Sequence, residues 1–156
     1  MIVHPALAKA RFERSIAALL ESPSTYDAAG IRTIEYEFPV LAVDLDWRRR
    51  DRRLRLRIDA TDFDYRPLQG WWIDDQGIAL IRGMNLVPHG AGFQVNPTPN
   101  QEQRCWFCFK GWRDYHDHSG HQDVAWAAIR HKQEFSPLAL LLQLTSNLDS
   151  PGLQTA

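Results

Sequence analysis

The stretch RLRLRIDA, residues 53–60, decides the fold class of this chain. Its even positions, from Leu54 to Ala60, are apolar, and its odd positions, from Arg53 to Asp59, are charged. Because successive side chains of a strand point to opposite faces, this alternation predicts a strand with one buried and one solvated face. Such half-solvated strands are typical of antiparallel sheets.

The same alternation extends to both sides of this stretch and predicts a β meander. The apolar positions are Ile34, Tyr36 and Phe38 before Pro39, and Leu41, Val43, Leu45 and Trp47 after it. The change of phase at Pro39 predicts a break or a bulge at a strand edge. A turn at residues 74–77 precedes a further short strand expected over 78–81, and Phe93 and Val95 indicate another.

Helical patterns flank the meander. Residues 5–21 begin with a proline and place Phe12, Ile16, Leu19 and Leu20 on one face. A leucine-rich helix follows Ser136-Pro137, an N-cap with a first-turn proline. We therefore expect a single α+β domain over residues 1–156: an antiparallel meander with N- and C-terminal helices packed on one face, and an irregular Cys/His segment at about 102–126.

Bulk composition narrows the classes of partner. The 156 residues carry a formal net charge of −1, and the seven arginines in 47–57 are nearly balanced by six aspartates in 44–64. Neither nucleic acid nor a membrane is therefore an expected partner. The chain has no run approaching the ~18 apolar residues of a membrane span, and its first helix is too charged for a signal peptide. We expect a cytoplasmic protein.

The scarcest side chains gather in one short segment. Both cysteines and three of the six histidines lie in the seventeen residues from Cys105 to His121. Thiolate and imidazole are preferred ligands of zinc, so a bound divalent metal is the first hypothesis, with zinc leading and iron or nickel open. The candidate ligands are Cys105, Cys108, His116, His118 and His121, with Asp114 as either a further ligand or an acceptor that orients an imidazole.

Local structure leaves several ligand sets open. A helix over 112–119 would place Asp114, His118 and His121 on one face, whereas an extended segment would pair His116 with His118. Cys105 could instead be a small buried side chain. In the alternative without a metal, the histidines are solvated and the cysteines pack among the neighbouring aromatic residues.

The run CWFCFKGWRDYHDHSGHQDVAW, residues 105–126, resembles the bacterial CEHH family of predicted metal-binding proteins. Members of that family are encoded beside ubiquitin-like modifiers and their activating, conjugating and deconjugating enzymes. The resemblance implies metal binding in such a pathway, with the modifier, the activating enzyme or a conjugating enzyme as partner. Asp114 stands where the family's glutamate is expected.

The order of elements is also similar to the ubiquitin-conjugating (UBC) fold. That fold runs from a helix through a meander and a proline-rich turn to a His-Pro-Asn loop, a catalytic cysteine and a final helix. The matching segments here are residues 64–67, Thr98-Pro99-Asn100, Cys108 and the helix after Ser136. Thr98 stands where that fold has its histidine.

Two functions follow from these resemblances. In the first, the protein is a non-catalytic UBC-like subunit whose Cys108 binds metal and which acts by binding a conjugating enzyme or the modifier, as a homodimer or a heterodimer. In the second, it is a conjugating enzyme: Cys108 accepts the modifier as a thioester, and Asn100 stabilises the oxyanion. The first agrees better with the CEHH resemblance.

Overall fold

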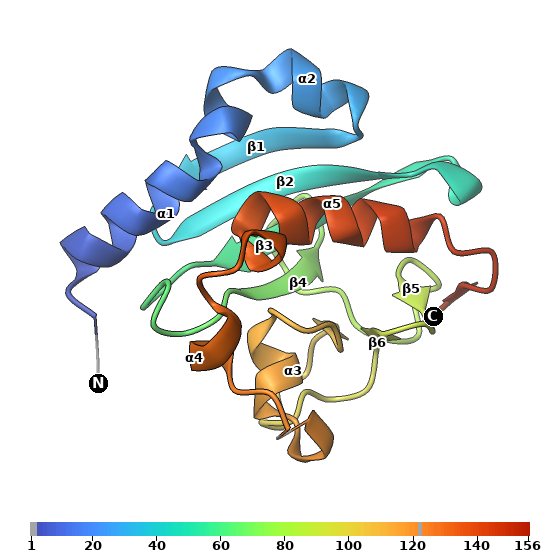
Figure 1. Cartoon of the computed structure of the whole chain (residues 1–156). Helices are drawn as coiled ribbons and strands as arrows, with labels where there is room; N and C mark the ends of the chain where they lie inside the picture. Colours follow the sequence, from blue (N-terminus) through green and yellow to red (C-terminus); the bar gives the residue numbers. More distant parts are fainter. Residues whose placement is uncertain (1–2, 122) are drawn as a thin grey trace.

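A computed structural model describes residues 3–121 and 123–156 (Figure 1). It confirms the α+β class, with a four-stranded antiparallel sheet in the order β1-β2-β3-β4 and helices at both ends of the chain. The sheet strands are β1 (Ile31–Glu37), β2 (Val40–Trp47), β3 (Arg52–Asp59) and β4 (Gln69–Ile73). The helices are α1 (Pro5–Glu21), α2 (Pro23–Ala28), α3 (Arg113–Asp117), α4 (Trp126–Ile129) and α5 (Pro137–Leu148).

Shorter elements complete the chain. They are the strands β5 (Pro88–His89), β6 (Phe93–Gln94), β7 (Trp106–Phe107) and β8 (Gln154–Thr155), and the 3-10 turns η1 (Arg48–Arg50), η2 (Ser119–His121) and η3 (Gln133–Phe135). No helix among the described residues has the length and apolar character needed to cross a bilayer.

The predicted alternation builds the sheet face that carries the core. β2 and β3 pair along their full lengths, from Val40 opposite Asp59 to Trp47 opposite Arg52. The odd positions of β2 are buried, and so are Leu54, Leu56 and Ile58 of β3, which confirms the expected inner face. On the opposite face Asp44 accepts two hydrogen bonds from Arg55, so the charged positions neutralise one another.

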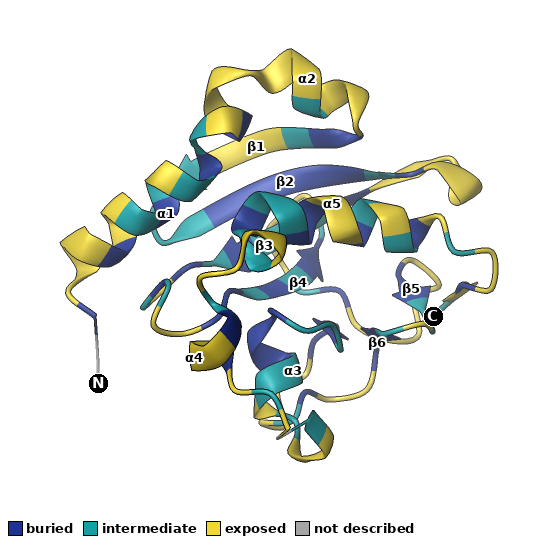
Figure 2. Cartoon of the chain, viewed as in Figure 1, coloured by how far each residue is buried: buried dark blue, intermediate teal, exposed yellow. Residues whose placement is uncertain are grey.

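Both terminal helices bury their apolar stripes against this inner face (Figure 2). Helix α1 has the expected bounds, and its Phe12 and Ile16 are fully buried. Leu20, expected on the same stripe, is instead 41% exposed. Helix α5 is N-capped by Ser136, whose hydroxyl accepts from the Ala139 N–H. Its Leu140, Leu141, Leu144 and Leu148 join the same core cluster. The helices therefore cover one face, as expected.

The break predicted at Pro39 is confirmed as the two-residue turn between β1 and β2, and a separate register shift lies between Thr33 and Glu35. The strand expected over 78–81 is wrong: only an isolated bridge joins Ala79 to Ile73. The Asp74 carboxylate accepts from the backbone N–H groups of residues 76 and 78, which closes this segment as a turn.

Strand β4, which the sequence patterns did not reveal, anchors the Cys/His segment to the sheet. The backbone of Leu68, just before β4, bridges to Trp112 and accepts a hydrogen bond from the Arg113 N–H at 2.8 Å. A Cβ atom at Gly70 would lie 2.7 Å from the Trp112 ring, so a larger residue there would displace that ring. Trp112 in turn packs on Phe107 of β7 with ring centroids 5.1 Å apart. The start of α3 is thus fixed against the sheet.

Replacing Phe12 by alanine tests the core. We expect Phe12→Ala to lower the free energy of unfolding by about 3–5 kcal/mol, because a fully buried ring leaves a cavity between α1 and the sheet. Leu7→Ala, on the same helix but 47% exposed, is the matched control and should change that free energy by less than about 0.5 kcal/mol. Chemical denaturation measures both, and equal losses would contradict this assignment of the core.

Candidate functional site

The two cysteines flank β7 and differ in burial. Cys105 and Phe107 point into the core and are each 1% exposed, whereas Cys108 is half-buried at the surface of the domain. The Cys105 thiol donates to the Leu80 carbonyl at 3.3 Å, and burial raises its pKa to about 11. Of the two alternatives for Cys105, the structure therefore favours the small buried side chain over the metal ligand.

Asp114 is engaged inside the domain. Its two carboxylate oxygens accept from Arg104 at 3.0 and 3.2 Å, and both side chains are buried. Burial raises the pKa of Asp114, while the Arg104 guanidinium opposes that rise. In this structure the Asp114 carboxylate neutralises a buried cation, and its role as a metal ligand or as an acceptor that orients an imidazole stays a prediction.

Cys108 meets an imidazole. Its Sγ lies 3.2 Å from Nε2 of His121, within hydrogen-bonding distance for sulfur. The His121 ring stacks on Tyr115, with centroids 4.1 Å apart and planes within 10° of parallel. Burial raises the pKa of Cys108, which favours the neutral thiol. The tautomer of His121 sets which of the two groups donates. Tyr115, which the sequence did not single out, orients this imidazole.

The other two histidines differ in their surroundings. His116 accepts from the Gly111 N–H through Nε2, and its Nδ1 lies 3.2 Å from the Val124 carbonyl. Burial lowers the pKa of His116, which favours the neutral ring that links these two backbone segments. His118 stacks on Trp106, and its ring centroid lies 5.2 Å from that of His121.

Neither predicted backbone geometry for these ligands occurs. Helix α3 ends at Asp117, His118 is extended, and η2 follows, so Asp114 and His118 do not share the face of a longer helix. Among the described residues, no group of three or more His, Cys, Asp or Glu side chains is arranged to hold a metal ion. A closed four-ligand zinc site therefore does not fit these residues as they are placed.

Cys108 lines a hollow of about 630 Å³ between α3 and the loop before β7. Its walls include Thr98, Pro99, Gln101, Trp106, Asp117 and His118. Asn100 donates through Nδ2 to Asp117 at 2.9 Å and joins the loop to α3. This side-chain amide is therefore held by Asp117 in the resting structure, whereas we expected it to face an oxyanion beside Cys108.

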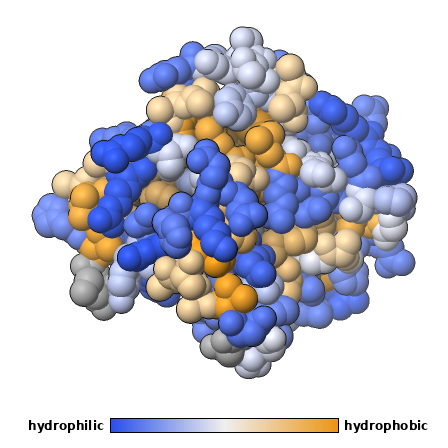
Figure 3. All heavy atoms as spheres, viewed as in Figure 1, coloured by the Kyte–Doolittle hydropathy of each residue, from blue (hydrophilic) through white to orange (hydrophobic). Residues whose placement is uncertain are grey.

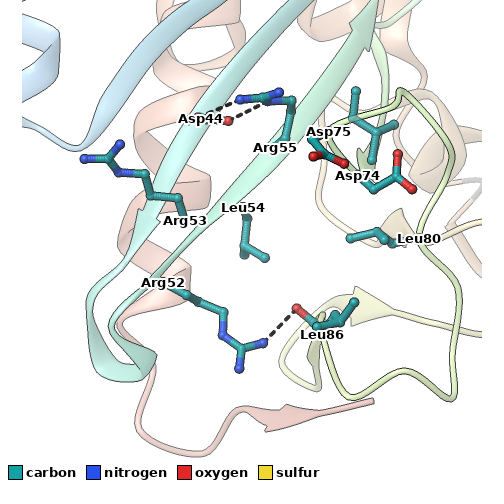
Figure 4. A pocket seen from close by; sticks show the side chains of 10 residues that line it. Asp44, Arg52, Arg53, Leu54, Arg55, Asp74, Asp75, Leu80 and Leu86 are labelled. Carbon is teal, nitrogen blue, oxygen red and sulfur yellow. Dashed lines mark hydrogen bonds and ion pairs between the residues drawn. The ribbon is translucent and has the colours of Figure 1, made fainter.

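A second hollow, of about 440 Å³, lies at the end of β3 that β4 does not cover (Figure 4). Several of its charged side chains are already paired: Arg55 is bonded to Asp44, and Arg52 donates to the Leu86 carbonyl. No cysteine or histidine lines it. Other arginines of residues 47–57 also contact the protein itself. Arg49 donates to the Asp149 carbonyl, and Arg50 donates to the Leu153 carbonyl.

The chain matches no family model, and a search of curated proteins finds no similar sequence. The feature that these residues form together is one accessible thiol hydrogen-bonded to an imidazole at the edge of a hollow.

Thiol alkylation tests this geometry. We expect iodoacetamide to modify Cys108 in the native protein and to spare Cys105, because Cys105 is buried and its pKa is about 11. Since burial also raises the pKa of Cys108, its alkylation rate should rise with pH. The pH at which this rate is half-maximal should lie above the ordinary thiol pKa of about 8.5. Mass spectrometry of Cys108→Ser and Cys105→Ser proteins identifies the modified thiol. Equal native labelling of both cysteines would contradict the structure.

Proposed function

We propose that this chain is a UBC-like protein of a bacterial ubiquitin-like modification pathway, in which Cys108 accepts the C-terminus of the modifier as a thioester. The observation that carries the proposal is the 3.2 Å contact between the Cys108 thiol and His121 at the edge of the hollow. The resemblance of the chain to the UBC fold supplies the substrate class. The partners are then the modifier and its activating enzyme.

The geometry supports this function in preference to the non-catalytic function favoured by the sequence. Cys108 is the half-buried thiol, and the hollow gives a substrate carbonyl access to it. Cys105 and Asp114, two expected members of a metal shell, are occupied in the core. A thiol that does not belong to a closed coordination shell remains available as a nucleophile.

The transfer follows from the resting hydrogen bond. The Cys108 sulfur attacks the carbonyl carbon of the modifier's C-terminus, which the activating enzyme presents as a thioester. As the new C–S bond forms, His121 Nε2 takes the thiol proton. The former C–S bond breaks, and the departing thiolate of the activating enzyme is protonated from His121 or solvent. Tyr115 holds the imidazole plane throughout.

An adduct assay tests this function. We expect the protein, mixed with modifier, activating enzyme and ATP, to form a covalent adduct that is removed by reductant. Cys108→Ser should abolish the reductant-sensitive adduct, and Cys105→Ser, the matched control, should retain it. His121→Gln should slow its formation by about 10²-fold or more, as expected for loss of a general base. If no adduct forms while the wild-type protein binds both partners, this proposal is wrong.

One observation favours a second function: the His121 ring lies between Cys108, 3.2 Å from its Nε2, and the His118 ring, whose centroid is 5.2 Å away. These three side chains are not arranged as a metal site in the structure, so a metal would have to draw them together. Thiolate and imidazole are zinc ligands, so these three donors are the ones that could hold a metal in the non-catalytic function implied by the CEHH resemblance. The protein would then act by binding a conjugating enzyme or the modifier, with zinc stabilising residues 108–121.

Metal quantitation separates the two functions. If the second proposal holds, the purified wild-type protein contains a stoichiometric metal ion, and both Cys108→Ser and His121→Ala lose it. Chelation should then lower the melting temperature markedly, because structural zinc contributes on the order of 10 kcal/mol to folding. Cys105→Ser should keep the metal. A metal-free wild-type protein with an unchanged melting temperature after chelation would exclude this second function.

A further inference from the structure

A basic cleft outside the Cys/His segment lies between α1 and the connection from α4 to α5. We use this name for the hollow of about 290 Å³ lined by Arg11, Arg14, Ser15, Phe63, Asp64, Arg130, His131, Lys132, Gln133, Phe135, Ser136 and Pro137. Figure 3 shows strongly hydrophilic side chains gathered on this face, over α1 and beside the start of α5.

The wall of the basic cleft is held in place by specific contacts. The Trp126 indole N–H donates to the Asp64 carbonyl at 2.8 Å and ties α4 to the loop after β3. The Asp64 carboxylate accepts from Arg11 at 3.3 Å, so the same residue fixes one arginine of α1. Phe63 and Pro137 are buried and form the apolar floor. Arg11 and the floor of the cleft are therefore held by packed elements, whereas Lys132 lies in an exposed turn.

Charge within the basic cleft is strongly unbalanced. Arg11, Arg14, Arg130 and Lys132 line it, and Asp64 is its one carboxylate among the lining residues. The whole chain carries a formal charge of −1, so this excess is local. Within residues 3–121 and 123–156, no hydrogen bond or ion pair involves the side chains of Arg14, Arg130 or Lys132. Three cations thus share one recess without a counter-ion from the protein.

We propose that the basic cleft binds a phosphate-bearing ligand, either free phosphate or a phosphorylated side chain. A guanidinium presents a planar set of donors that matches two phosphate oxygens, and a lysine ammonium adds a mobile donor. A recess of this volume accommodates a compact dianion together with the first atoms attached to it. Phe63 and Pro137 of the floor would then contact the part of the ligand that carries the phosphate. This inference does not depend on the function of Cys108.

Isothermal titration at constant ionic strength tests the site with inorganic phosphate, a phosphoserine peptide, the same peptide with serine, and oligoglutamate. We expect phosphate and the phosphopeptide to bind and the serine peptide not to bind. The double variant Arg14→Glu, Lys132→Glu should weaken binding by about tenfold or more, because each lost cation removes a charge-assisted contact. A preference for the phosphopeptide would identify a phosphorylated side chain as the source, and equal affinity would identify free phosphate.

The matched control is the double variant Arg53→Glu, Arg82→Glu, which changes the net charge equally at exposed positions outside the cleft. It should keep the wild-type affinity within about twofold. Melting temperatures without phosphate show whether each variant is folded, and Arg14→Gln replaces the first variant if it is not. The proposal is overturned by no phosphate binding at millimolar concentration, by equal losses in both double variants, or by oligoglutamate binding as tightly as the phosphopeptide.

Discussion

The candidate site depends on the packing of β7 against β4 and Trp112. Phe107 lies between Trp72 and Trp112, with ring centroids 5.2 and 5.1 Å away, and all three rings are buried. Once Phe107 points into the core, strand geometry turns Cys105 to the same side and leaves Cys108 at the surface. A C-x-x-C pair that could have held one ion is thereby divided into a core thiol and an accessible thiol.

The buried Arg104–Asp114 ion pair fixes the position of α3 relative to the residues before β7. Arg104 contacts Glu102 and Asp114 and lies over Trp71, with its guanidinium carbon 4.5 Å from the ring centroid. Removing either partner would leave an uncompensated buried charge, which costs several kcal/mol. Such a pair contributes specificity of placement more than net stability. The Arg104–Asp114 pair explains why Asp114 points into the domain although histidines follow it in the sequence. The same pair keeps α3, and with it the stacked rings of Tyr115 and His121, next to Cys108.

The three histidines of the Cys/His segment make different contacts because their surroundings differ. His116 joins two backbone segments, His118 stacks on Trp106, and His121 reaches the Cys108 sulfur. These arrangements follow from where α3 ends and η2 begins, which sets the direction of each ring. The same reasoning applies to the arginines: Arg49 and Arg50 bond to carbonyls near the C-terminus, whereas Arg14 and Arg130 line the recess of the basic cleft.

Periodicity in the sequence determined the main elements. The alternation around Leu54 and Leu41 predicted the inner sheet face, and the helical spacing of Phe12 and Ile16 predicted α1, because both patterns arise from regular local geometry. The sequence also drew attention to Cys108 and His121. The tertiary structure alone decided that these two side chains meet while Cys105 and Asp114 turn away. It also decided that Arg14 of α1 and Lys132 line one recess, because long-range packing, which has no local period, sets those distances.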